Sequence, residues 1–171
     1  MSYFHISVDN QIGPVGALVS GVDLSQPLSA DVIQEIHAAW LRHHVLFFRD
    51  QELSPSAQAR FASYFGELDQ YPFMKPVDDS AYVIPIVKEA GATINFGGDW
   101  HTDTSYKSCP PKATLLYAVE VPEQGGDTLF ADATAAYAAL SPAMRVSLES
   151  WQGIYSPKLV HGQGGDYKSV A

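Results

Sequence analysis

Apolar residues in the first third of the chain repeat at helical spacing in two places, with a continuous apolar run between them. The first helical face, which follows Ser29 as a potential N-cap, predicts a helix over about residues 30–42. Its apolar members are Val32, Ile33, Ile36 and Trp40. The run at 45–48 predicts a strand buried on both faces. A Ser-Pro pair at 54–55 then predicts the start of a second helix, which we expect to end near Gly66.

Strand-like patterns dominate the rest of the chain. Short segments rich in β-branched and aromatic residues predict strands at 3–8, 16–20, 82–87, 114–121, 128–130 and 153–160. Two further helices are predicted, one at about 132–140 and one that begins at 141 and ends near 151. Helices around the edges of a mainly β framework indicate an α+β fold that is compatible with a jelly roll.

Composition narrows the class of protein. With 46% hydrophobic residues and no linker or repeat, the 171 residues fit a single domain over residues 1–171. The net charge of −9 and the scattered basic residues argue against a nucleic-acid partner. Cys109 is the only cysteine, which excludes an intrachain disulfide and a cysteine cage for a metal. Since neither a signal-peptide pattern nor an apolar run of about 20 residues is found, we expect a cytoplasmic protein without a membrane partner.

One short motif carries recognisable chemistry. In the stretch NFGGDWHTDTSY at 95–106, His101 and Asp103 are two residues apart, and on a strand such residues point to the same face. One carboxylate and two imidazoles on one face are the ligands of non-haem Fe(II) oxygenases. The spacing alone is weak evidence, because about 0.4 such pairs are expected by chance and an exposed loop histidine near an aspartate is the simpler interpretation. The glycine pair at 97–98 adds weight, since it permits close approach of the backbone.

The surrounding sequence resembles the taurine dioxygenase-like family. The matching segments, in order along the chain, are GALVSGVDLSQPL at 16–28, LRHHVLFFRDQ at 41–51, FGEL at 65–68, WHTD at 100–103, PP at 110–111, GGDTLF at 125–130 and AYAALS at 136–141. Members of this family are Fe(II)- and 2-oxoglutarate-dependent oxygenases with a double-stranded β-helix, which is a jelly-roll barrel. The resemblance implies that residues 1–171 are the N-terminal portion of such a catalytic domain. It also implies hydroxylation of a small organic acid, sulfonate or related molecule by dioxygen, with release of succinate and CO2.

The resemblance assigns roles to three residues. His101 and Asp103 match the two iron ligands of the family motif. Thr128 matches the threonine that hydrogen-bonds the distal carboxylate of 2-oxoglutarate. By its own sequence context, Thr128 is simply a β-branched residue that opens a strand after a glycine turn.

The family pattern is incomplete in this sequence. The third iron ligand, a second histidine, and the arginine for 2-oxoglutarate lie farther beyond the His-x-Asp pair than this sequence extends. His161, in a glycine-rich loop, is the only histidine downstream of His101. We therefore expect either part of a longer protein or a fragment that pairs with a second copy to cover open strand edges, with little turnover from the 171 residues alone.

Two alternative functions stay open. The first is a truncated, non-catalytic binding or assembly module that keeps the front half of the fold. The second is a zinc hydrolase using His101, Asp103 and His161, although no base-and-nucleophile pattern accompanies them.

Substrate residues of the taurine enzymes are not matched. Those enzymes carry a histidine shortly after the Phe-Gly-Glu-Leu segment and an asparagine four residues before the ligand histidine, where this sequence has Asp69-Gln70-Tyr71 and Gly97. Taurine is therefore not the expected substrate. The candidates for lining the substrate pocket are Tyr71, Asn95 and Phe96.

Overall fold

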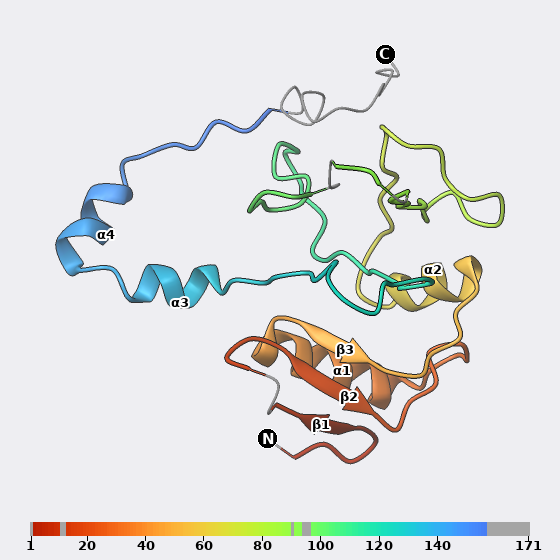
Figure 1. Cartoon of the computed structure of the whole chain (residues 1–171). Coiled ribbons are helices and arrows are strands. Elements are labelled where there is room, and N and C mark those ends of the chain that lie inside the picture. The colour runs from red at the N-terminus through yellow and green to blue at the C-terminus, as the bar shows by residue number, and fades with distance from the viewer. Residues whose placement is uncertain (1, 11–12, 90, 94–96, 157–171) are drawn as a thin grey trace.

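The structure is a computed structural model that describes residues 2–10, 13–89, 91–93 and 97–156. Its elements are β1 (Ser7–Asp9), β2 (Ala17–Ser20), α1 (Ala30–His43), β3 (Leu46–Phe48), α2 (Pro55–Ser63), α3 (Ala133–Ala138) and α4 (Pro142–Leu148). The three strands and α1 form one body with α2 beside it, and α3 and α4 lie on an arm that extends away from this body (Figure 1).

The predicted helix over 30–42 is confirmed as α1, and its ends follow from local chemistry. The Ser29 hydroxyl accepts a hydrogen bond from the Val32 amide at 3.4 Å, as the N-cap prediction requires. At the other end, His44 adopts a φ of +66°, and its amide donates to the Trp40 carbonyl at 2.7 Å. This left-handed residue stops α1 and turns the chain directly into β3.

The predicted strands at 3–8, 16–20 and 45–48 are confirmed in shorter form as one three-stranded sheet. β2 is the central strand, antiparallel to β1 and parallel to β3, with Ser7 opposite Ser20 and Ala17 opposite Leu46. The expectation that β3 is buried on both faces is wrong, because Phe47 is 38% exposed. Its ring has one aromatic neighbour among the described residues, Phe130 at 6.2 Å.

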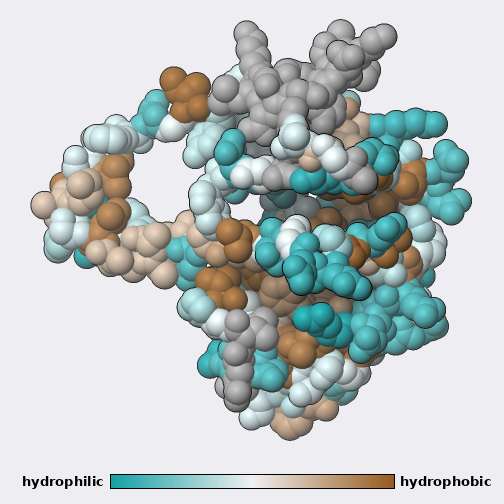
Figure 2. Space-filling view, in the orientation of Figure 1, coloured by the Kyte–Doolittle hydropathy of each residue, from teal (hydrophilic) through white to brown (hydrophobic). Residues whose placement is uncertain are grey.

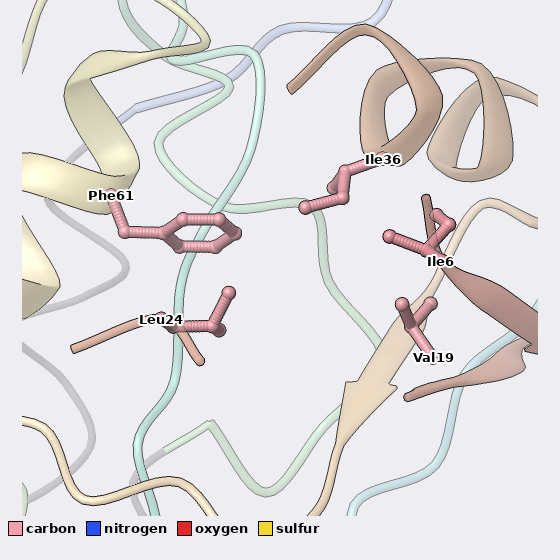
Figure 3. Close-up of a cluster of buried hydrophobic side chains, with 5 residues drawn as sticks. All are labelled: Ile6, Val19, Leu24, Ile36 and Phe61. Carbon is pink, nitrogen blue, oxygen red and sulfur yellow. The ribbon is translucent and has the colours of Figure 1, made fainter. Parts of the chain in front are cut away.

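A small hydrophobic core joins the sheet, α1 and α2. Figure 3 shows its five buried members, which are Ile6, Val19, Leu24, Ile36 and Phe61. The Phe61 ring from α2 contacts Phe48 of β3 and Phe65 at centroid distances of 5.8 and 5.3 Å in edge-to-face geometry. This packing holds α2 against the sheet. The segment around Leu115 later contacts α2 through a hydrogen bond from Gln58.

A carboxylate on α1 holds the segment that precedes β1. Glu35 accepts hydrogen bonds from the backbone amides of Phe4, His5 and Ile6 at 2.7, 2.9 and 3.2 Å. Burial raises the pKa of the Glu35 carboxyl, but these bonds outweigh that effect and hold the pKa at about 2, below the usual 4.5. The charged form of Glu35 therefore stabilises the folded N-terminus.

Replacement of Glu35 with glutamine should make stability less dependent on acid pH. Because the folded pKa lies below the unfolded one, the contribution of the carboxylate is present above about pH 4.5 and is lost as the pH falls toward 2. Thermal unfolding should show a lower Tm for Glu35→Gln at neutral pH, and the difference from the natural protein should shrink over this interval. Glu123→Gln, in an exposed loop, is the control. A Tm difference that stays constant from pH 7 to pH 2 would contradict this role of Glu35.

The strands predicted in the second half do not form in the described residues. Segments 82–87, 114–121, 128–130 and 153–156 are irregular, and residues 157–160 of the last prediction lie outside the described part. Several large apolar side chains in these segments are exposed, with Leu116 at 66% and Val119 at 88%. A strand requires a ladder of backbone hydrogen bonds to a neighbouring strand, and among the described residues none of these segments belongs to one. The described elements therefore do not confirm the mainly β jelly roll.

The arm contains the last two predicted helices, both confirmed and both shorter than expected. Asp132 caps α3 and its carboxylate also lies 3.7 Å from His44 Nε2, which connects the arm to the end of α1. Neither helix buries a residue. Figure 2 shows apolar surface along this arm. No helix in the described part of the chain has the length and apolar character needed to cross a membrane.

Candidate metal centre

His101 and Asp103 lie in a loop rather than on the strand that the sequence predicts. His101 lies in irregular backbone, whereas Asp103 begins a turn over 103–106 in which Thr104 adopts a φ of +46°. The turn is closed by a hydrogen bond from the Lys107 amide to the Thr104 carbonyl at 3.0 Å. The two side chains nevertheless converge, because the turn brings the Asp103 carboxylate back toward the imidazole.

The separation between the two side chains is short and their orientation is defined. His101 Nε2 lies 3.1 Å from Asp103 Oδ1, and His101 Nδ1 lies 2.7 Å from the carbonyl oxygen of Asp99. A carbonyl oxygen only accepts hydrogen bonds, so Nδ1 carries the proton and donates it to Asp99. In the neutral imidazole this leaves the lone pair of Nε2 facing the carboxylate.

The donor set fits a divalent cation. Two lone-pair atoms 3.1 Å apart repel each other unless a proton or a metal ion lies between them. Two ligands at right angles on one ion, each at about 2.1–2.2 Å, lie about 3.0–3.1 Å apart. The His101 and Asp103 side chains are about half exposed, at 50% and 51%, so an ion has access from solvent.

The backbone of Gly97 lies close against the imidazole ring of His101. The φ of Gly97 is +66°, and a Cβ at this position would lie 2.9 Å from His101 Cε1. The sequence predicts close approach of the backbone at the glycine pair, and the structure identifies the approaching group as the His101 ring. A residue with a side chain would have to displace that ring.

A residue that the sequence analysis missed completes the contacts of Asp103. The Thr114 hydroxyl donates a hydrogen bond to Asp103 Oδ2 at 2.6 Å, which leaves Oδ1 directed at His101. The length is that of a charge-assisted hydrogen bond to a carboxylate. No sequence signal identifies Thr114, because a contact across eleven residues of irregular chain has no characteristic spacing.

A third protein ligand is not found in the described part of the chain, where no three His, Cys, Asp or Glu side chains gather around one point. His161 lies outside the described residues. Thr128 is exposed and follows two glycines with positive φ, Gly125 and Gly126. Within the described residues its hydroxyl makes no hydrogen bond to His101 or Asp103, and its role toward 2-oxoglutarate stays a prediction.

Of the three predicted substrate residues, Tyr71 can be placed, whereas Asn95 and Phe96 lie outside the described residues. The Tyr71 ring contacts Phe73 at 5.4 Å, and Phe73 contacts Tyr106 at 6.3 Å. Tyr106 closes the turn that begins at Asp103, so an aromatic row leads from Tyr71 to the loop of the dyad. Burial raises the pKa of the Tyr106 phenol. Phe73 and Tyr106 are not among the residues predicted from the sequence to line the site.

Comparisons with known proteins agree with the resemblance. The profile of the family described as taurine catabolism dioxygenase TauD, TfdA family matches residues 8–170. An alpha-ketoglutarate-dependent sulfate ester dioxygenase of Pseudomonas putida is 36% identical over 92% of this chain and 50% of its own length. An alkylsulfatase of Acinetobacter baylyi is 34% identical over 88% of this chain and 47% of its own length.

Solved structures of dioxygenases also resemble this chain. The crystal structure of a putative alpha-ketoglutarate-dependent taurine dioxygenase from Burkholderia xenovorans superimposes with a TM-score of 0.74 at 36% identity, covering 85% of this chain and 51% of the other. The chain thus spans about half the length of the curated relatives it matches. It belongs to the TauD/TfdA family, whose members are Fe(II)- and 2-oxoglutarate-dependent dioxygenases.

Proposed function

We propose that the protein is an Fe(II)- and 2-oxoglutarate-dependent dioxygenase that hydroxylates a small organic acid, sulfonate or related molecule. Residues 1–171 form the N-terminal portion of its catalytic domain. The observation that carries this proposal is the 3.1 Å separation between His101 Nε2 and Asp103 Oδ1, with Nδ1 held by the Asp99 carbonyl. Family membership over residues 8–170 supports the identity of the metal and the co-substrate.

His101 and Asp103 would hold the iron through Nε2 and Oδ1. When bound, Fe(II) and 2-oxoglutarate supply the oxidising chemistry, in which one atom of dioxygen enters the substrate as a hydroxyl group and the other enters succinate. The Asp99 carbonyl keeps the proton of His101 on Nδ1, so that the lone pair of Nε2 stays free to bind the metal. The carboxylate of Asp103 adds one negative charge to the site, which favours a divalent cation over a monovalent one.

Thr128 would bind the distal carboxylate of 2-oxoglutarate. A hydroxyl that donates to a carboxylate forms a short, charge-assisted hydrogen bond. The support for this role is the Gly125-Gly126-Asp127-Thr128 sequence, which keeps the family pattern, together with the positive φ of both glycines and the exposure of Thr128.

The proposed substrate is an acidic small molecule other than taurine. Relatives at 34–36% identity are named for sulfate ester or alkyl sulfate chemistry. The aromatic row of Tyr71, Phe73 and Tyr106 offers apolar surface near the dyad. Gly97 offers no side chain where the taurine enzymes have an asparagine amide. These features favour an anionic headgroup on an apolar body.

Oxygen uptake and succinate formation test the proposed activity. The protein at its full natural length, supplied with Fe(II) and 2-oxoglutarate, should form succinate faster with one or more members of a panel of alkyl sulfates, sulfonates and aryloxy acids than without them. Oxygen consumed, succinate formed and hydroxylated product should agree in amount. Failure of every panel member to stimulate succinate formation, in protein that also binds no divalent cation, would contradict the proposal.

A further inference from the structure

The loop of the dyad lies outside the regular secondary structure. His101 and Asp103 are half exposed, and neither lies in a helix or a strand. A carboxylate on such a loop can rotate about its side-chain bonds and can present either oxygen, or both, to a cation. A site with defined geometry therefore needs a group that holds one oxygen in place.

Thr114 is placed to do this. Its hydroxyl donates to Asp103 Oδ2 at 2.6 Å, on the opposite side of the carboxylate from the oxygen that faces His101. An oxygen engaged as acceptor of a short hydrogen bond is a weaker metal ligand than the free one. The contact thus selects Oδ1 and favours binding through one oxygen.

Thr114 is itself fixed by the neighbouring residue. Leu115 packs against the hydrophobic core of the N-terminal body, and its carbonyl accepts a hydrogen bond from Gln58 Nε2 on α2 at 3.2 Å. Two residues later, the Tyr117 hydroxyl donates to the Gln51 carbonyl at 3.1 Å. The segment that follows residue 110 passes beside α2 (Figure 1). Thr114 therefore connects the dyad to the segment that is anchored on the hydrophobic core and α2.

From these contacts we infer that Thr114 is a positioning residue for the metal ligand Asp103. Its hydrogen bond to Asp103 Oδ2 holds the carboxylate at a fixed position relative to the core and α2. The inference rests on the proposed function, since it requires that Asp103 bind a divalent cation. Thr114 does not touch the cation in this role. Loss of its hydroxyl should weaken metal binding while leaving the fold intact, because the Thr114 side chain is exposed.

Binding of Mn(II) in the presence of 2-oxoglutarate, followed by the EPR signal of the free ion, tests this role without relying on turnover. In the protein at its full natural length, Thr114→Val should weaken Mn(II) binding about 10- to 100-fold, the usual effect of removing a partner that orients a metal ligand. Thr114→Ser, which restores the hydroxyl, should bind nearly as well as the natural protein. Thr134→Val, at an exposed threonine of α3, should bind normally.

The contradicting outcomes separate the two proposals. Unchanged Mn(II) affinity in Thr114→Val would overturn the positioning role and leave the metal site standing. Equal weakening in Thr114→Val and Thr114→Ser would also overturn it, because the hydroxyl would then not be responsible. Absence of Mn(II) binding by the natural protein would remove the proposed metal site and the role of Thr114 together.

Discussion

Replacement of His101 with alanine is expected to reduce succinate formation to background in the protein at its full natural length. The imidazole is one of the two candidate metal ligands in the described residues, and its Nε2 faces Asp103 Oδ1 at 3.1 Å. Loss of a metal ligand should lower activity by more than the roughly 10- to 100-fold that follows loss of a group that only orients a ligand. The measurement is the initial rate of succinate formation with Fe(II), 2-oxoglutarate and the substrate found in the panel.

The control for this variant is another histidine. His37→Ala removes an exposed imidazole from α1 that packs against Trp40 and Phe65 at 5.7 and 6.2 Å. It should keep normal turnover. Thermal unfolding of both variants should resemble that of the natural protein, since the His101 side chain is half exposed. Unchanged turnover in His101→Ala would remove this residue from the metal site.

Replacement of Gly97 with alanine is expected to damage the site almost as severely, through the position of the imidazole. The added Cβ would lie 2.9 Å from His101 Cε1, a distance that forces the ring to move. A displaced ring breaks the 2.7 Å hydrogen bond from Nδ1 to the Asp99 carbonyl and moves Nε2 out of line with Asp103. We expect Mn(II) affinity to fall by at least about 10-fold, by analogy with the loss of an orienting partner.

Gly91 provides a matched control for the cost of backbone strain. Its φ of +83° is as unfavourable for alanine as the +66° of Gly97, but a Cβ on Gly91 would contact nothing within 4 Å. Gly91→Ala should therefore lower stability by a similar amount and leave Mn(II) affinity unchanged. Equal loss of affinity in the two variants would show that strain in the loop, rather than contact with the His101 ring, is the cause.

The parts of the fold that the sequence predicts well are those determined by neighbouring residues. The helix at 30–43 starts where Ser29 caps it and ends where His44 turns left-handed. The strands at 17–20 and 46–48 also form as expected, and they pair in parallel with α1 as the crossover between them. Segment 114–121 has an equally strong strand pattern but no ladder partner in the described residues, so its backbone stays irregular and Val119 is 88% exposed.

The candidate site was predicted in part and for a partly wrong reason. Spacing predicted that His101 and Asp103 converge, which they do at 3.1 Å, but the expected strand is a turn with Thr104 at a φ of +46°. Contacts between distant residues were not predictable. Thr114 reaches Asp103, and Phe73 and Tyr106 extend the aromatic row from Tyr71, only because the loops fold back on each other.

A crystal structure of the full-length protein with Mn(II) and 2-oxoglutarate, with the metal located by its anomalous scattering, tests the metal site most directly. The proposed site predicts one Mn(II) within about 2.0–2.3 Å of both His101 Nε2 and Asp103 Oδ1, with Asp103 Oδ2 still bonded to Thr114. A metal bound at other residues, with His101 and Asp103 bonded only to each other, would contradict it.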